Sequence, residues 1–273
     1  MAKTKILIAV KTYPTLAEKY DELVCTAGFR EDGSWVRIYP IPFRKLEYDK
    51  QYKKYDWVEI DLVRNNSDFR PESYRPYSID CTFEILGHID TDNNWELRKG
   101  IVLNNVFTNL GNLISDAQDK KKLTSLAVFK PTLIKNFIWK RVEREWDKFK
   151  LAKLKAKALQ LNLFSNSDNP FEVVRKLPYE FSYVFSDDAG RESTLMIEDW
   201  EAGQLYWNCL ERNEGDELKA CADVKKKYFD DFAKTKDLYF YLGTTRQFHM
   251  ISLNPFIIIG TFYPKKNSQL SLF

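Results

Sequence analysis

The sequence predicts a β-rich protein of the α+β class, in which a helical and basic middle segment joins two β-rich units. Two observations predict this arrangement. Short stretches that alternate apolar and polar residues, as half-buried strands do, occur before residue 90 and again after residue 178. Between them, residues 120–157 contain thirteen Lys or Arg against three acidic residues and include a Lys-rich helical pattern.

The first unit is expected to contain five short strands. Turn residues at 31–34 separate the second strand from the third, and Pro40 and Pro42 end the third. Five strands within about 90 residues are typical of a small barrel or sandwich. The strands are expected at residues 6–10, 22–27, 35–39, 57–63 and 82–87.

The middle and last parts of the chain alternate helices with strands. Trp146 and Phe149 fall on the apolar side of the Lys-rich helix, and turn residues at 187–190 indicate a hairpin. Helices are expected at residues 104–116, 143–161 and 216–234, and strands at 125–131, 134–139, 179–185, 193–197, 238–242 and 256–262.

These elements divide the chain into four parts. Residues 1–103 form an N-terminal β-barrel unit, and residues 104–164 a helical, basic connecting segment that includes the first strands of the second unit. Residues 165–263 form the C-terminal β unit, and residues 264–273 a flexible tail.

The composition excludes several classes of protein. No window approaches the roughly 20 apolar residues that a membrane span needs, and the N-terminus lacks a secretory signal, so we expect a cytoplasmic protein without a membrane partner. Phosphate-loop and dinucleotide-binding glycine motifs are absent. The four cysteines are far apart and the chain has two histidines, which predicts reduced thiols, no bound metal and no cofactor.

Five segments carry a resemblance to a known family: Lys11–Thr15, Tyr20–Gly28, Trp35–Pro42, Pro178–Tyr183 and Ile197–Glu201. They resemble the bacterial family called the dual OB-containing domain. The resemblance covers nearly the whole chain and implies two small β-barrels of the oligonucleotide/oligosaccharide-binding (OB) type, joined here by the helical basic segment. It brings no set of catalytic residues with it, so it supports an architecture more than an activity.

The last five residues are similar to the peptides with which bacterial polymerases and repair proteins dock on the β sliding clamp. In this peptide Leu272 and Phe273 would fill an apolar pocket of the clamp while Gln269 forms directional hydrogen bonds. The alternative is that these apolar residues fold back onto the protein's own sheet. A second copy of the pattern spans Gln160–Phe164, where ordinary packing at the end of a helix is the competing interpretation. The predicted clamp-binding residues are Gln269, Leu270, Ser271, Leu272 and Phe273.

An OB-type barrel that holds single strands needs aromatic rings for base stacking and cations for phosphates. Several of the aromatic residues must belong to the core, so the prediction concerns the surface as a whole. The candidate nucleic-acid-binding residues are Arg37, Tyr39, Phe43, Arg44, Lys45, Arg70, Tyr74, Arg75, Lys130, Lys135, Trp139, Arg141 and Arg144.

Acidic residues around the expected hairpin raise the alternative of a metal-dependent nuclease. Two-metal cleavage of a phosphodiester needs carboxylates that converge on one point. The interpretation that competes with a nuclease site is that Asp199 and Trp200 have a structural role. We therefore predict a non-enzymatic accessory protein of replication, repair or phage defence that binds the sliding clamp and single-stranded or duplex nucleic acid. A clamp-tethered nuclease and a protein-interaction module without nucleic-acid binding are the alternatives. The acidic residues are Asp187, Asp188, Glu192, Glu198, Asp199 and Glu201.

Overall fold

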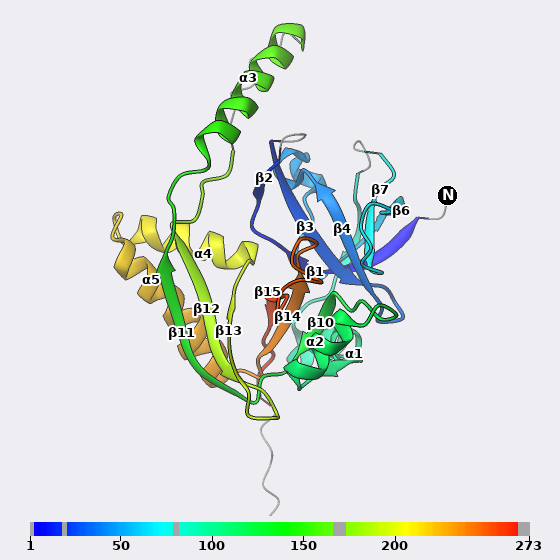
Figure 1. Cartoon of the computed structure of the whole chain (residues 1–273), viewed down its shortest axis with the longest axis vertical. Coiled ribbons are helices and arrows are strands. Elements are labelled where there is room, and N and C mark those ends of the chain that lie inside the picture. Colours follow the sequence, from blue (N-terminus) through cyan, green and yellow to red (C-terminus); the bar gives the residue numbers. More distant parts are fainter. Residues whose placement is uncertain (1–2, 18–20, 79–81, 166–172, 267–273) are drawn as a thin grey trace, which may run out of the picture.

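The computed structural model describes residues 3–17, 21–78, 82–165 and 173–266. The protein is β-rich, with a curled half-barrel sheet and few helices (Figure 1). Its strands form three sheets of eight, four and three strands, and the eight-stranded sheet lies at the N-terminal end of the chain.

The N-terminal sheet has the strand order β6-β7-β4-β3-β1-β5-β8, and β2 pairs with β3. All of these pairs are antiparallel except β4 with β7. The strands are β1 (Thr4–Lys11), β2 (Thr15–Ala17), β3 (Asp21–Phe29), β4 (Trp35–Ile41), β5 (Asp56–Ile60), β6 (Leu62–Arg64), β7 (Ser73–Pro76) and β8 (Glu84–His88).

Strand β1 explains why an apolar run without alternation forms a strand here. Its side chains point alternately to the two faces of the sheet, and each face is covered by its own hydrophobic cluster. Ile6 and Ile8 belong to the cluster inside the curled sheet. Leu7 and Ala9 belong to a second cluster, between this sheet and the four-stranded sheet. A strand that is buried on both faces must be apolar throughout.

The four-stranded sheet has the order β15-β14-β10-β9 and packs against the N-terminal sheet through the second cluster. Leu7 and Phe29 meet Val128, Tyr241 and Ile259 there, so the two sheets share one core. This region contains α1 (Asp92–Val102), β9 (Val106–Phe107), α2 (Leu110–Gln118), β10 (Leu126–Phe129), β14 (Tyr239–Thr244) and β15 (Phe256–Phe262).

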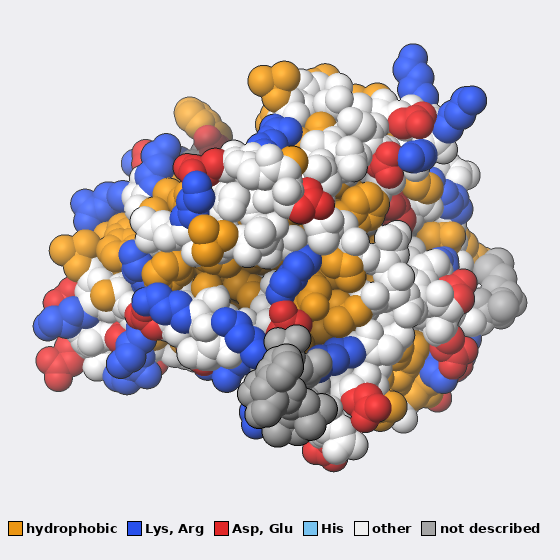
Figure 2. Space-filling model, turned by 90° about the horizontal axis from the view of Figure 1, so that it is seen from below, with side chains coloured by type: hydrophobic (Ala, Val, Ile, Leu, Met, Phe, Trp, Pro, Cys, Tyr) orange, Lys and Arg blue, Asp and Glu red, His pale blue; other side chains and the backbone are white. Residues whose placement is uncertain are grey.

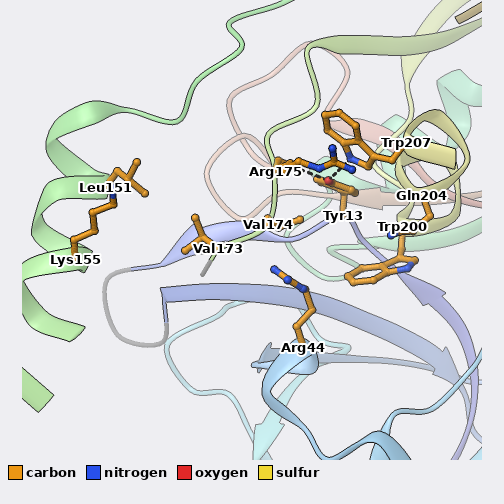
Figure 3. A pocket seen from close by; sticks show the side chains of 10 residues that line it. All are labelled: Tyr13, Arg44, Leu151, Lys155, Val173, Val174, Arg175, Trp200, Gln204 and Trp207. Carbon is orange, nitrogen blue, oxygen red and sulfur yellow. Dashed lines mark hydrogen bonds between the residues drawn. The ribbon is translucent and has the colours of Figure 1, made fainter. Parts of the chain in front are cut away.

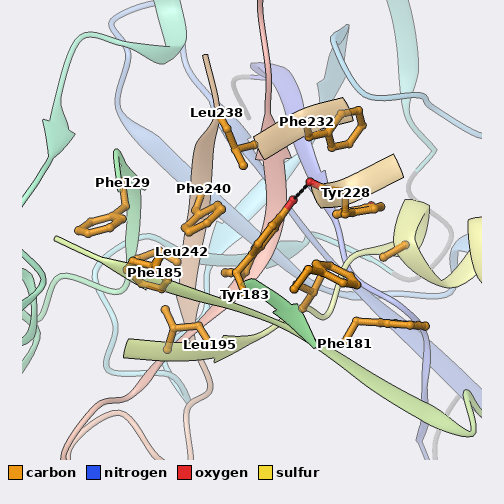
Figure 4. Close-up of a cluster of buried hydrophobic side chains, with 14 of the residues drawn as sticks. Phe129, Phe181, Tyr183, Phe185, Leu195, Tyr228, Phe232, Leu238, Phe240 and Leu242 are labelled. Carbon is orange, nitrogen blue, oxygen red and sulfur yellow. Dashed lines mark hydrogen bonds between the residues drawn. The ribbon is translucent and has the colours of Figure 1, made fainter. Parts of the chain in front are cut away.

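The three-stranded sheet has the order β11-β12-β13 and is covered by helices α4 and α5 (Figure 1). An aromatic core fills the space beneath it (Figure 4). Tyr183 stacks on Phe240 and donates a 2.6 Å hydrogen bond to the carbonyl of Tyr228. The elements are β11 (Leu133–Arg141), α3 (Lys148–Ser165), β12 (Tyr179–Ser186), β13 (Glu192–Met196), α4 (Trp200–Arg212), α5 (Glu217–Lys225) and the π-helix η3 (Lys226–Ala233).

The hairpin β12–β13 and strand β15 confirm the sequence prediction. The helix expected at 216–234 is present, but it widens from α to π geometry after Lys225. The prediction that Phe149 lies on a covered apolar side of α3 is wrong. Helix α3 projects from the body (Figure 1), and Phe149 is 88% exposed. In the part of the chain described here, no helix combines the length and apolar composition needed to cross a bilayer.

Candidate functional site

A groove lies where the N-terminal sheet meets helices α3 and α4, and it encloses about 600 Å³ (Figure 3). Rings and cations share its walls, which is the combination that binds stacked bases and phosphates. The residues that line it are Tyr13, Arg44, Leu151, Lys155, Val173, Val174, Arg175, Trp200, Gln204 and Trp207.

Two segments that lie far apart in the sequence meet to form the floor of the groove. Thr12, just after β1, forms an antiparallel bridge with Asp199. Asp199 then begins α4, because its side chain accepts a hydrogen bond from the backbone amide of Glu201. A Cβ atom on Gly203 would lie 2.2 Å from the ring of Tyr13, so only glycine allows α4 to approach this closely. The bridge between Thr12 and Asp199 joins two of the segments that carry the family resemblance, Lys11–Thr15 and Ile197–Glu201.

The hydroxyl of Tyr13 holds the aromatic residues of the groove in place. It accepts a 2.8 Å hydrogen bond from the indole nitrogen of Trp207 and donates one of 2.7 Å to the carbonyl of Arg175. The ring of Tyr13 lies 6.4 Å from that of Trp200. Burial raises the pKa of Tyr13, so the hydroxyl keeps the proton that it donates. Trp200 and Trp207 lie two turns apart on the same side of α4.

Three cations also line the groove. The guanidinium of Arg175 lies 3.9 Å above the ring of Trp207, which leaves its N–H edge for an anion. Arg44 points into the groove from η1 (Phe43–Lys45) and donates a 2.9 Å hydrogen bond to Glu22 (Figure 3). Lys155 faces the same space from α3.

A second hollow of about 430 Å³ shares Trp200 and Gln204 with the groove. Lys54 lies there with its ammonium 3.0 Å from Asp199 and 2.8 Å from Glu201. Burial raises the pKa of Asp199 to about 6, although the ammonium of Lys54 opposes this shift. Burial alone would lower the pKa of Lys54, but the two carboxylates outweigh it and raise that pKa. The hollow is lined by Lys11, Lys53, Lys54, Trp200, Glu201, Gln204, Leu205 and Asn208.

Two of the arginines predicted to bind nucleic acid are buried. Arg37 donates to the hydroxyl and carbonyl oxygens of Ser125 at 2.7 and 3.0 Å, so its guanidinium serves the fold. Arg70 pairs with Asp68 at 2.6 Å and donates to the carbonyl of Thr244. Both join the curled sheet to the rest of the protein, and neither presents its charge to the surface.

The other candidates of the first unit lie in different surroundings. Phe43 is buried against Tyr52. Tyr39 is 40% exposed, and Lys45 and Arg75 are exposed. Tyr74 is half-buried, with the guanidinium groups of Arg30 and Arg64 near its ring. Of these candidates only Arg44 lines the groove.

The candidates from the middle segment lie away from the groove and face acidic partners. Lys130 pairs with Asp237, Lys135 with Glu192, and Arg141 and Arg144 with Glu217. Trp139 packs against the aromatic core. In Figure 2, Lys and Arg side chains gather over the half of the molecule that contains the β11–β12–β13 sheet, mixed with hydrophobic ones.

The acidic residues do not converge on one point. Asp187 and Asp188 hold the start of α2, where they accept hydrogen bonds from the amide of Leu110 and the side chain of Asn109. Asp199 instead faces Lys54. In the described ranges, no group of three or more His, Cys, Asp or Glu side chains is placed to hold a metal ion. The cysteines described there, Cys25, Cys209 and Cys221, are free thiols.

The side chains of both clamp-like peptides lie outside the described part of the structure. Gln269–Phe273 lies outside the described residues. Gln160–Phe164 lies within the backbone of α3, but its side chains are outside the description.

Sequence reasoning missed most of the groove: it did not single out Tyr13, Arg175 or Trp207, and it weighed Trp200 only as a structural residue. One local signal was available, since Trp200 and Trp207 are seven residues apart and so share a face of any helix. The contact of α4 with Tyr13 joins segments too distant for local patterns to relate.

Comparison with family models gives two matches. Residues 2–104 match the family described as domain of unknown function DUF8758, and residues 107–273 match the one described as domain of unknown function DUF8757. A search of curated proteins found no match. The second match covers more than half of the chain, so the chain belongs to the DUF8757 family.

Proposed function

We propose that this member of the DUF8757 family is a non-enzymatic accessory protein that binds single-stranded nucleic acid in the groove and is recruited to the DNA sliding clamp. Replication, repair and phage defence in the bacterial cytoplasm are processes in which such a protein would act. The observation that carries the proposal is the joint arrangement of Tyr13, Trp200 and Trp207 with Arg44 and Arg175 around one open groove.

The rings and cations of the groove divide the work of binding a strand. Base stacking on an aromatic side chain contributes about 1–3 kcal/mol per base and tolerates any base, because every base has a π face. Arg175 lies on the ring of Trp207, and Arg44 enters from the opposite wall. A strand with its bases toward α4 would therefore have cations on both sides of its backbone.

Recruitment to the clamp rests on the sequence Gln269–Phe273. The described chain ends at Lys266, just after Lys265 forms a bridge with Lys236. Figure 1 shows this end of the molecule opposite the end from which α3 projects. A clamp bound there would leave the groove open to a strand.

The fold type belongs to the same proposal. The curled half-barrel supports an OB-type barrel for the first unit. The resemblance to the dual OB-containing family supports a second one and stays a prediction.

The test measures binding of a fluorescein-labelled oligothymidylate by anisotropy. Arg44→Gln with Arg175→Gln should weaken binding at least about tenfold, because each removes a charge-assisted hydrogen bond. The matched control is Arg141→Gln with Arg144→Gln, which removes the same charge from the surface predicted in the middle segment. We expect this control to change affinity less than about threefold at 0.15 M salt, where distant charges are largely screened.

Equal losses in the two double variants would contradict the groove as the binding site. The absence of oligonucleotide binding in the unaltered protein would favour an interaction module, and Mg²⁺-dependent cleavage would favour a nuclease. Deleting Gln269–Phe273 should abolish binding to purified β clamp while oligonucleotide binding persists. Clamp binding that survives the deletion would contradict recruitment through the tail.

A further inference from the structure

Lys11 ends strand β1 with its side chain in the second hollow, beside Trp200. Its ammonium lies 3.8 Å from the centre of the Phe43 ring and 4.7 Å from that of Trp200. In the described part of the protein it forms neither an ion pair nor a hydrogen bond. Ring faces stabilise such a cation less than an anion would at a desolvated site.

The charged groups around Lys11 leave its charge under-compensated. Burial lowers the pKa of Lys11 to about 8; Glu201, Asp199 and Asp56 act to raise it, and Lys54 acts to lower it. The ammonium of Lys54 already engages the carboxylates of Glu201 and Asp199. Because its pKa of about 8 lies above neutral pH, Lys11 is mostly protonated there.

The rest of the hollow offers further donors and some opposing charge. Lys53 is exposed on the same wall, and the amide of Asn208 faces it from α4. Glu201 opposes an anion, but its carboxylate is held by Lys54. Three lysines and one carboxylate line the hollow, so its lining carries a net positive charge, while Asp199 and Asp56 lie behind it.

We propose that this hollow binds a phosphate group of the nucleic-acid strand, with Lys11 as its principal ligand and the adjoining base on Trp200. The inference rests on the proposed function, because the hollow and the groove share Trp200 and Gln204 and one strand would pass from one to the other. It assigns phosphate recognition to a residue that lies outside the groove itself.

Binding of phosphate at Lys11 has a proton signature. A phosphate favours the charged ammonium, so it raises the pKa of Lys11 above its value of about 8 in the free protein. The protein should therefore take up about half a proton per strand bound at pH 8. Affinity should be highest below pH 8 and should fall as the pH rises from 8 toward the pKa of the bound state.

The experiment is calorimetric titration of the full chain with oligothymidylate at pH 8, in two buffers of different ionisation enthalpy. We expect proton uptake in the unaltered protein and its loss in Lys11→Met. Lys53→Met, which removes an exposed lysine from the same hollow, should retain it. Lys11→Arg should retain affinity while losing the uptake, because arginine stays protonated. An oligothymidylate with an uncharged methylphosphonate backbone should bind without uptake.

Proton uptake that persists in Lys11→Met would overturn the inference and leave the groove's role intact. A strand that binds the unaltered protein with no uptake at all would overturn it as well. Failure of the oligonucleotide to bind the unaltered protein would instead overturn the proposed function. Thermal unfolding of Lys11→Met and Lys11→Arg checks that both variants are folded.

Discussion

The two matched regions of the chain meet at two junctions that use arginine in opposite ways. At the closed junction, Arg37 and Arg70 cross from the curled sheet to Ser125 and Thr244 and are buried there. At the open junction, Arg44 lies against the groove. Arg37 and Arg44 are only seven residues apart in the sequence.

The junctions differ in how many hydrogen-bond acceptors the protein itself provides for each guanidinium. The guanidinium of Arg37 donates its hydrogen bonds to the carbonyl and hydroxyl oxygens of Ser125, so it is not available to a ligand. Among the described residues, Arg44 pairs with one carboxylate, that of Glu22, and its side chain points into the groove (Figure 3). An arginine becomes available to a ligand when the protein leaves part of its fork unpaired.

The largest effect on the free energy of unfolding is expected at the Lys54–Asp199 ion pair, which lies beside the open junction. Lys54→Met leaves Asp199 buried without its cation and should lower the free energy of unfolding by about 3–5 kcal/mol at pH 7.5. Asp199 has a pKa of about 6 in the folded protein, above its ordinary 3.8, so the folded state binds the proton more readily. Without Lys54 that pKa rises further, so the loss should shrink as the pH falls toward 6, below which Asp199 is protonated in both folded proteins.

Urea unfolding at pH 7.5 and 5.0 measures this effect, with Lys53→Met as the control for an exposed neighbouring lysine. Equal stability of the two variants at pH 7.5 would show that the Lys54–Asp199 pair is not an anchor.

The second effect compares the junctions directly. Arg37→Met removes the hydrogen bonds that a buried guanidinium donates to Ser125 and to the carbonyl of Thr244, and it should cost about 2–3 kcal/mol in urea unfolding. Arg44→Met removes the cation from the buried carboxylate of Glu22, which still accepts a hydrogen bond from the backbone amide of Val174, and it should cost about 1–2 kcal/mol. The order should reverse for oligonucleotide affinity, where the variant of Arg44 is the weaker binder. If the Arg37→Met variant has the same free energy of unfolding as the unaltered protein, the proposed difference between the two junctions is wrong.

The smallest effect concerns the fit of α4 against Tyr13. Gly203→Ala places a methyl group 2.2 Å from the ring of Tyr13 and should cost about 1–3 kcal/mol through overpacking. Gly100→Ala, in α1 with open space around it, should instead stabilise the protein by up to about 1 kcal/mol through helix propensity. The melting temperatures of the two variants should thus move in opposite directions, and a fall in both would leave the contact with Tyr13 unproven.

Local patterns were sufficient to predict the strands that lie wholly within one core. The alternation in residues 179–185 predicts β12 because its alternate side chains enter one aromatic cluster. Helix α4 was missed because Asp199, which begins it, had been grouped with the acidic residues of the hairpin. Asp199 caps α4 through the nearby amide of Glu201, whereas its bridge to Thr12 is a distant pairing on which local periodicity carries no information.

The candidate site was predicted in its chemistry but not in its members. Interleaved rings and cations were expected, yet Arg37, Phe43 and Arg70 are inside the fold and Trp207 and Arg175 are in the groove. Burial decides this difference, and burial depends on which segments meet across the whole chain.

The shared core beneath β1 bears on how the two matched regions are inherited. Leu7 and Val10 would face water if residues 107–273 were missing, and Val128 and Tyr241 would do so if residues 2–104 were missing. A polypeptide with one region alone would need the other face from a second polypeptide. Selection therefore acts on the pair, and we expect genes for the two regions to stay fused or adjacent.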